Sequence, residues 1–195
     1  MTDKQNTIES LIKDLLEGMA IKRWKALEKL GKMQAEEAVP SIITVMKNAK
    51  ISDVRRKAAE TLGKIGSKNA VRSLLETSLN KEEAGEVRRA AIKATGELAL
   101  IESVPALINI KKNGPMIDRV IATQALRNMA TKLGYKNINA LENAFREKLE
   151  QKKLATSDES KSKTEEEFYC SYCNVKIPDN KLITCPYCNA PLTKK

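Results

Sequence analysis

The sequence contains no histidine among its 195 residues. Histidine is the side chain whose ordinary pKa lies closest to neutral pH. Its absence therefore excludes Ser-His-Asp and Cys-His catalytic sites and every metal centre with histidine ligands. The phosphate-binding patterns G-x-x-x-x-G-K-[ST] and G-x-G-x-x-G are also missing. These absences argue against most common enzyme classes.

Cysteine is absent from residues 1–169, and aromatic side chains are scarce there. Residues 1–150 contain only Trp24, Tyr135 and Phe145 as aromatics, whereas four aromatics and all four cysteines follow residue 167. A secreted protein with stabilising disulfides would spread its cysteines over the whole fold. The chain is therefore expected to contain two regions with different cores.

No apolar run approaches the roughly 18 residues that a membrane span needs. The first ten residues lack the basic start and apolar stretch of a secretory signal. We therefore expect a cytoplasmic protein without a membrane segment.

A phrase of about twelve residues recurs every 31 to 33 residues in the first 150. Its copies occupy 22–33, 54–66 and 87–98, with a weaker one at 118–129. A second phrase follows each copy, at 38–43, 70–75, 103–108 and, in degenerate form, 138–141. Both phrases space apolar residues at i, i+3, i+4 and i+7, which predicts two amphipathic helices per unit.

Single residues in the repeat predict how these helices begin and pack. Pro40 and Pro105 fall in a first helical turn, where a missing N–H has no cost. Ser52 or Asp53 is expected to cap the helix that begins at Val54. Gly31, Gly63 and Gly96 share one position inside the helices, which predicts close helix–helix approach.

These phrases, above all V-R-x-x-A-x-x-x-L-G at 54–63, resemble HEAT repeats of the short PBS-lyase-like kind. The resemblance covers residues 20 to about 150, with a cap helix expected at 7–18, and the last copy has Arg127 in place of the glycine. It implies an all-α fold, a right-handed α-solenoid of about four helix pairs over residues 1–150, whose second helices line the concave side.

Arg23, Arg55, Arg88 and Arg119 occupy one position of the repeat, and Asp53, Glu86 and Asp118 lie nearby. We expect them to link adjacent units in the ladder that the resemblance implies, rather than to bind anions.

A further set of side chains lies on the second helices away from their apolar stripe. Residues 1–150 carry 27 basic and 19 acidic side chains, a net charge of +8, which would attract a phosphate-rich partner. Interleaved glutamates, many four residues from a lysine, equally fit an ordinary solvated surface. Trp24 is either an exposed contact or packed against the preceding cap helix. The candidate partner-binding residues are Trp24, Lys25, Lys29, Arg56, Lys57, Arg89 and Lys93.

The C-terminal region contains two C-x-x-C pairs separated by eleven residues: Cys170 with Cys173, and Cys185 with Cys188. Two such pairs can place four thiolates tetrahedrally around one Zn²⁺, leaving no open position for catalysis. Asn follows each pair and suits the left-handed turn of a zinc knuckle. We expect a small structural zinc ribbon over 168–195; a rubredoxin-like iron site and disulfides are the weaker alternatives.

Residues 151–167 are charged and serine-rich, and are expected to form a flexible linker. The whole arrangement predicts a non-catalytic scaffold that binds a protein partner through the solenoid and makes a second contact through the ribbon. Binding of nucleic acid or a ribonucleoprotein to a basic concave face is the alternative, and lyase or DNA-glycosylase activity has only fold analogy behind it. The sequence leaves the oligomeric state undetermined.

Overall fold

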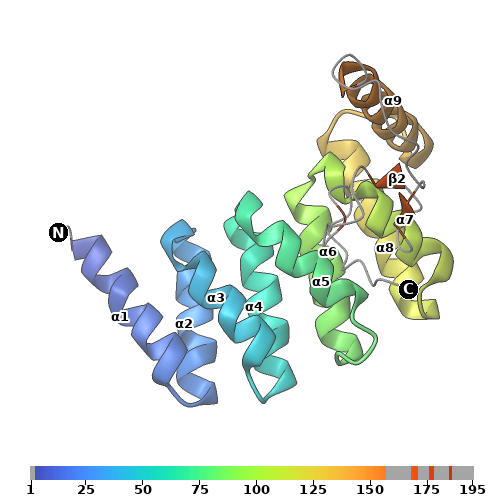
Figure 1. The fold of residues 1–195 in the computed structure, drawn as a ribbon. Coiled ribbons are helices and arrows are strands. Elements are labelled where there is room, and N and C mark those ends of the chain that lie inside the picture. The colour runs from blue at the N-terminus through green and yellow to red at the C-terminus, as the bar shows by residue number, and fades with distance from the viewer. Residues whose placement is uncertain (1–2, 157–167, 171–175, 178–184, 186–195) are drawn as a thin grey trace.

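The computed structural model describes residues 3–156, 168–170, 176–177 and 185. Within these residues, helices follow one another along the chain as successive antiparallel pairs (Figure 1). The helices are α1 (Asp3–Glu17), α2 (Ala20–Met33), α3 (Val39–Asn48), α4 (Ser52–Ile65), α5 (Val71–Leu79), α6 (Gly85–Leu98), α7 (Val104–Asn113), α8 (Met116–Lys132) and α9 (Ile138–Thr156). This arrangement is an all-α solenoid, as the sequence predicts.

Each unit consists of a first helix and a second helix. The four pairs are α1–α2, α3–α4, α5–α6 and α7–α8, and α9 stands alone after them. Short 3-10 turns at Glu36–Ala38, Lys68–Ala70 and Ile101–Ser103 lead into α3, α5 and α7. Proline lies in the first turn of both α3 and α7, which confirms the expectation for Pro40 and Pro105.

The core lies between the rows of first and second helices. Leu27, Leu62 and Leu126 are fully buried from the second helices, and Ile42 and Leu107 from the first. Ala58 and Ala59 are also fully buried, because they lie on the stripe of α4 that faces its neighbours.

The second helices of successive units pack tightly against each other, while the first helices of successive units make fewer contacts. A Cβ built on Gly63 would lie 2.9 Å from the Cβ of Ala94, and one built on Gly96 would lie 2.7 Å from the Cβ of Ala125. The predicted close approach at the shared glycine is confirmed. A stack that is tighter along its second helices curves toward them, so these helices line its inner side.

Three local expectations differ from the structure. The helix α4 begins at Ser52 rather than Val54, so Ser52 and Asp53 are its first residues and not its cap. Its N-cap is Ile51, whose apolar side chain makes no cap hydrogen bond. The helix α9 continues to Thr156, so the first six residues of the expected 151–167 linker are helical. The N-terminal helix α1 runs over Asp3–Glu17, beginning four residues before the expected 7–18.

We predict that Gly96→Ala destabilises the solenoid by about 1–3 kcal/mol, because the added methyl would overlap Ala125. This cost should exceed the helix-propensity gain of about 1 kcal/mol that alanine brings. Gly85→Ala is the matched control, since its Cβ would meet only the ends of the Arg89 and Arg88 side chains and no backbone atom. Chemical denaturation followed by circular dichroism measures both; equal stability of the two variants would refute the close approach.

Candidate protein-interaction surface

The second helices α2, α4, α6 and α8 present their outer sides on one surface, which we call the second-helix face. All seven predicted partner-binding residues lie on three of these helices. Lys25, Lys29 and Lys93 are exposed, whereas Arg56, Lys57 and Arg89 are half-buried. The positions of these residues repeat from helix to helix because the repeat length matches one helix pair.

A groove of about 420 Å³ runs between α4, α6 and α8 on this face. Ala90, Ala94 and Ile121 contribute apolar surface to its lining. Its charged lining residues are Arg56, Lys64, Arg89, Lys93, Glu60, Glu86 and Glu97. The groove therefore brings together three of the predicted basic residues, but it places three carboxylates beside them, and the residues of α2 lie outside it.

Arg56 is held by two carboxylates of its own helix. Its Nη2 lies 3.0 Å from Oδ1 of Asp53 and its Nη1 lies 2.7 Å from Oε1 of Glu60. The hydrogen bond to Asp53 is the largest cause that raises the pKa of Arg56 above its ordinary value. A phosphate would have to displace these partners, which lowers the gain from binding it.

Glutamates on the same face stay ionised. A hydrogen bond from its own backbone N–H and another from Ser52 hold the pKa of Glu86 below its ordinary value. A hydrogen bond from Lys32 does the same for the pKa of Glu28, whose Oε1 lies 2.9 Å from Nζ of that lysine. Negative charge thus persists on the second-helix face well below neutral pH.

Trp24 is 39% exposed and is not part of the buried core. The Nζ atom of Lys57, on the next second helix, lies 4.1 Å from the centroid of its ring. This distance is within the range of a cation–π contact. Of the two sequence interpretations, the structure supports the exposed one.

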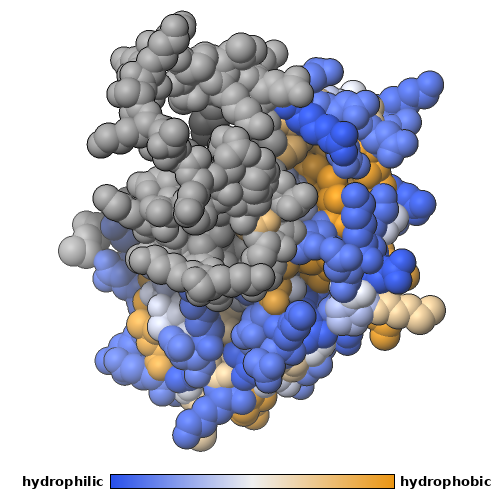
Figure 2. Space-filling view, turned by 45° about the vertical axis from the view of Figure 1, so that its right-hand side comes forward, coloured by the Kyte–Doolittle hydropathy of each residue, from blue (hydrophilic) through white to orange (hydrophobic). Residues whose placement is uncertain are grey.

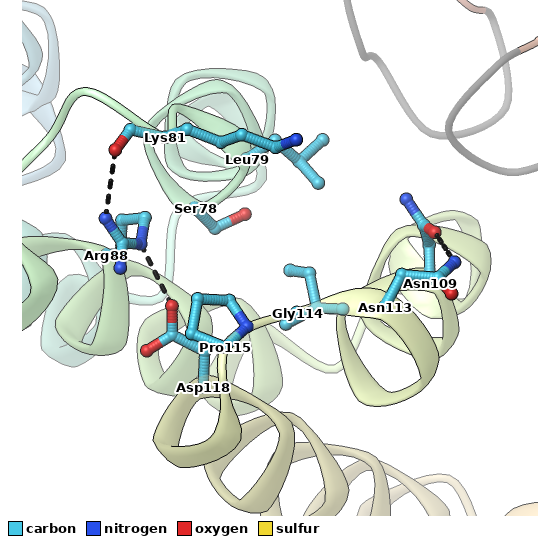
Figure 3. A pocket seen from close by; sticks show the side chains of 10 residues that line it. Ser78, Leu79, Lys81, Arg88, Asn109, Asn113, Gly114, Pro115 and Asp118 are labelled. Atoms are coloured by element: carbon cyan, nitrogen blue, oxygen red, sulfur yellow. Dashed lines mark hydrogen bonds and ion pairs between the residues drawn. The ribbon is translucent and has the colours of Figure 1, made fainter.

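Two of the four ladder arginines link adjacent units. Arg55 Nη2 lies 2.8 Å from Oε1 of Glu83, and Arg88 Nε lies 2.9 Å from Oδ2 of Asp118 (Figure 3). Glu83, rather than the expected Glu86, is the partner of Arg55. Its position in the loop before α6, outside the repeated phrase, is the reason that the pattern did not reveal it.

Each ladder arginine also donates hydrogen bonds to carbonyls that precede its own helix. Arg55 bonds the carbonyl of Ala49 at 2.6 Å, and Arg88 bonds that of Glu83 at 2.6 Å. Arg23 bonds the carbonyls of Leu16 and Gly18, both at 2.8 Å. The row is therefore structural: it ties the loops of each unit to its second helix.

Asp118 is the most buried acidic side chain of the described residues, with 2% exposure. Its Oδ2 accepts from Arg88, while its Oδ1 has no hydrogen-bond partner and lies 3.8 Å from Nη1 of Arg89. The carboxylate is thus balanced by two successive arginines, one on each side. Arg89 is the looser of the two, because 3.8 Å is too long for a hydrogen bond.

A second hollow of about 620 Å³ lies between α5, α6, α7 and α8 (Figure 3). Arg88 and Asp118 in its wall bond each other, and Asn113 Nδ2 donates to Oδ1 of Asn109 at 2.7 Å. These pairs occupy Arg88, Asn109 and Asn113 with partners inside the protein, whereas Oδ1 of Asp118 has no hydrogen-bond partner.

The C-terminal region contributes two short strands, β1 (Phe168–Tyr169) and β2 (Lys176–Ile177). They pair antiparallel, with Phe168 opposite Ile177, so that the first C-x-x-C pair falls in the connection between them. Cys170 and Cys185, one from each pair, are both buried. Cys173 and Cys188 lie outside the described residues.

No helix among the described residues has the length and apolar character needed to cross a membrane.

The family model for HEAT repeats matches residues 8–96, from α1 into α6. The match and the helical architecture support a HEAT-repeat solenoid, and the matched range takes in α1 together with the first three second helices. The comparison with curated proteins finds no significant match.

We predict that Arg88→Ala destabilises the solenoid by about 3 kcal/mol, because it leaves the buried Asp118 without its hydrogen-bonded partner. Arg119→Ala is the matched control: this arginine holds the same repeat position in the last unit, is exposed, and reaches only the carbonyl of Lys111. It should cost less than about 1 kcal/mol. Similar unfolding midpoints for the two variants in urea would contradict a stabilising ladder.

Proposed function

We propose that this protein is a non-catalytic scaffold that binds a protein partner through its second-helix face and makes a second contact through a C-terminal zinc ribbon. The main support is the groove between α4, α6 and α8. Its cations and carboxylates alternate, so its field is mixed rather than strongly positive. A protein segment, which carries both signs of charge and apolar groups, complements such a groove better than a polyphosphate backbone. HEAT repeats commonly mediate contacts of this kind.

Two sites on one chain would strengthen binding without either being tight. The covalent connection between solenoid and ribbon turns the second contact into an intramolecular step, which raises the overall affinity. The charged and serine-rich composition of 157–167 suits a tether between them.

The residues of the C-terminal region fit Zn²⁺. Cys170 and Cys185, one from each C-x-x-C pair, are both buried, which agrees with thiolates that bind a structural metal. The metal would be held by Cys170, Cys173, Cys185 and Cys188 and would supply folding free energy to the ribbon.

A pull-down with the full-length chain as bait tests the interaction surface. We predict that a protein partner stays bound after nuclease treatment of the lysate and is lost with Lys64→Glu/Lys93→Glu. Both lysines line the groove and are exposed. Reversing two charges should weaken recognition by at least tenfold. Arg56 and Arg89 are poorer choices, because their replacement would disturb existing ion pairs.

The matched control is Lys13→Glu/Lys112→Glu, which reverses two exposed lysines on the first helices α1 and α7. It should leave binding unchanged. If nuclease abolishes retention, and if binding to a labelled RNA falls steeply with salt, the partner is nucleic acid and the proposed function is wrong.

We also predict one zinc per chain in the purified protein, measured by elemental analysis. Cys185→Ser should release the metal and unfold the ribbon, since a lost thiolate leaves an incomplete tetrahedral site. The helical circular dichroism signal of α1–α8 should remain, because the buried core residues described for them all lie between Ile8 and Phe145. Sub-stoichiometric zinc, or iron in its place, would refute the assignment.

A further inference from the structure

Exposed apolar side chains are concentrated at the two ends of the row of second helices. Nine large apolar side chains are exposed among the residues whose burial is described. Six of these nine lie at the start of α2 or of α8: Met19, Ile21 and Trp24, and Met116, Ile117 and Val120. Figure 2 shows the wider setting, a mainly hydrophilic surface interrupted by separate orange hydrophobic groups.

The repeat places these side chains in register with charged residues of the middle helices. Ile21 and Ile117 correspond to Asp53 and Glu86 of α4 and α6, which stand at the same helical position. Trp24 and Val120 correspond likewise to Arg56 and Arg89. At both repeat positions, the residue of α2 is apolar, those of α4 and α6 are charged, and that of α8 is apolar again.

Ile121 connects the apolar end on α8 to the groove. It lines the groove together with Arg89 and Lys93 of α6, one residue after the exposed Val120. At the other end, Lys57 of α4 lies over Trp24. Both apolar ends thus adjoin the charged middle and belong to one surface.

Each second helix carries more basic than acidic side chains, and the two end helices have the fewest carboxylates, one each. The helix α2 carries a single carboxylate, Glu28, which is paired with Lys32, and exposed lysines surround Trp24. The helix α8 carries only Asp118, which is buried, while its arginines Arg119 and Arg127 are exposed. Uncompensated cations therefore flank both apolar ends, which favours acidic residues in the partner.

We propose that the second-helix face holds one extended acidic protein segment through two apolar anchor sites, Ile21 with Trp24 at one end and Ile117 with Val120 at the other. This inference rests on the proposed function and specifies its partner. The anchors supply apolar burial, the flanking cations bind acidic residues, and the groove residues Lys64 and Lys93 contact the stretch of the segment between the anchors.

The spacing of the anchors sets the length of the segment. From α2 to α8 there are three intervals between neighbouring second helices, each about 8–10 Å. The anchors are therefore about 24–30 Å apart, which an extended chain covers with about seven to nine residues at about 3.3 Å each.

Panning a phage library of random 16-residue peptides on the full-length protein tests this inference. We expect enriched peptides to contain two apolar clusters about seven to nine residues apart, with Asp or Glu beside each. The affinity of a synthetic enriched peptide, measured by fluorescence anisotropy, should fall at least tenfold with Trp24→Ser and at least tenfold with Val120→Ser.

Leu133→Ser is the matched control, because Leu133 is 39% exposed, like Trp24, but belongs to neither anchor site. It should leave the affinity unchanged.

The distance between the two apolar clusters of the peptide gives a further check. Shortening the stretch between them to three residues should reduce the affinity to that of a peptide with one cluster.

Two results would overturn the inference. The first is a peptide affinity that falls with only one of the two anchor substitutions, or with Lys64→Glu/Lys93→Glu but with neither anchor substitution. This result refutes the two anchors but leaves the proposed function standing. Failure to enrich any peptide also refutes it, and the pull-down with nuclease then decides separately whether the face binds a protein.

Discussion

The close approach of successive second helices is the constraint on which the rest of this structure depends. It is possible because Gly63 and Gly96, which have no side chain, lie directly against Ala94 and Ala125 of the next second helix. A side chain at either glycine would separate the helices and change the spacing of every later unit. Only the second helices are so tightly spaced, and the stack therefore curves toward them. The second helices thus form the inner face of the stack.

Tight spacing also makes neighbours of residues 28 to 33 positions apart in the sequence. Lys57 reaches Trp24, Arg55 reaches Glu83 and Arg88 reaches Asp118, each across a unit boundary. Arg23 donates to carbonyls of its own unit, and Asp53 of the next unit pairs with Arg56 instead. Arg119, in the last unit, makes only the hydrogen bond to a preceding carbonyl. The ladder is thus a consequence of stacking, and its two rungs start from the two middle units.

The parts of this architecture that repeat were predictable, and the parts that depend on single side chains were not. The period of the apolar pattern predicted paired helices, and the shared glycine predicted their close contact. The ladder partner Glu83 was missed because it belongs to a loop, where spacing in the sequence does not determine position. Ser52 was misassigned as a cap because the helix begins two residues earlier than the repeated phrase, and its hydroxyl contacts Glu86, which only folding brings near. The same holds for the candidate site. The sequence predicted which helices carry it, but the carboxylates that pair with Arg56 and Arg89 became known only from the structure.

The helix α8, the last second helix of the stack, has a polar part that suits a cap and an exposed apolar part that a cap does not need. Terminal repeats need a polar outer side, and α8 provides one by placing the exposed Arg127 where earlier second helices have glycine. That arginine also prevents a further helix from packing as closely as α6 packs on α4. Capping therefore accounts for the polar half of α8, but it gives no reason for Met116, Ile117 and Val120 to stay 59–83% exposed. Exposed apolar groups in a solvated helix lower solubility unless something covers them. A similar cluster lies at α2, next to cations as on α8, and this likeness of the two ends is the reason for proposing one partner that covers both.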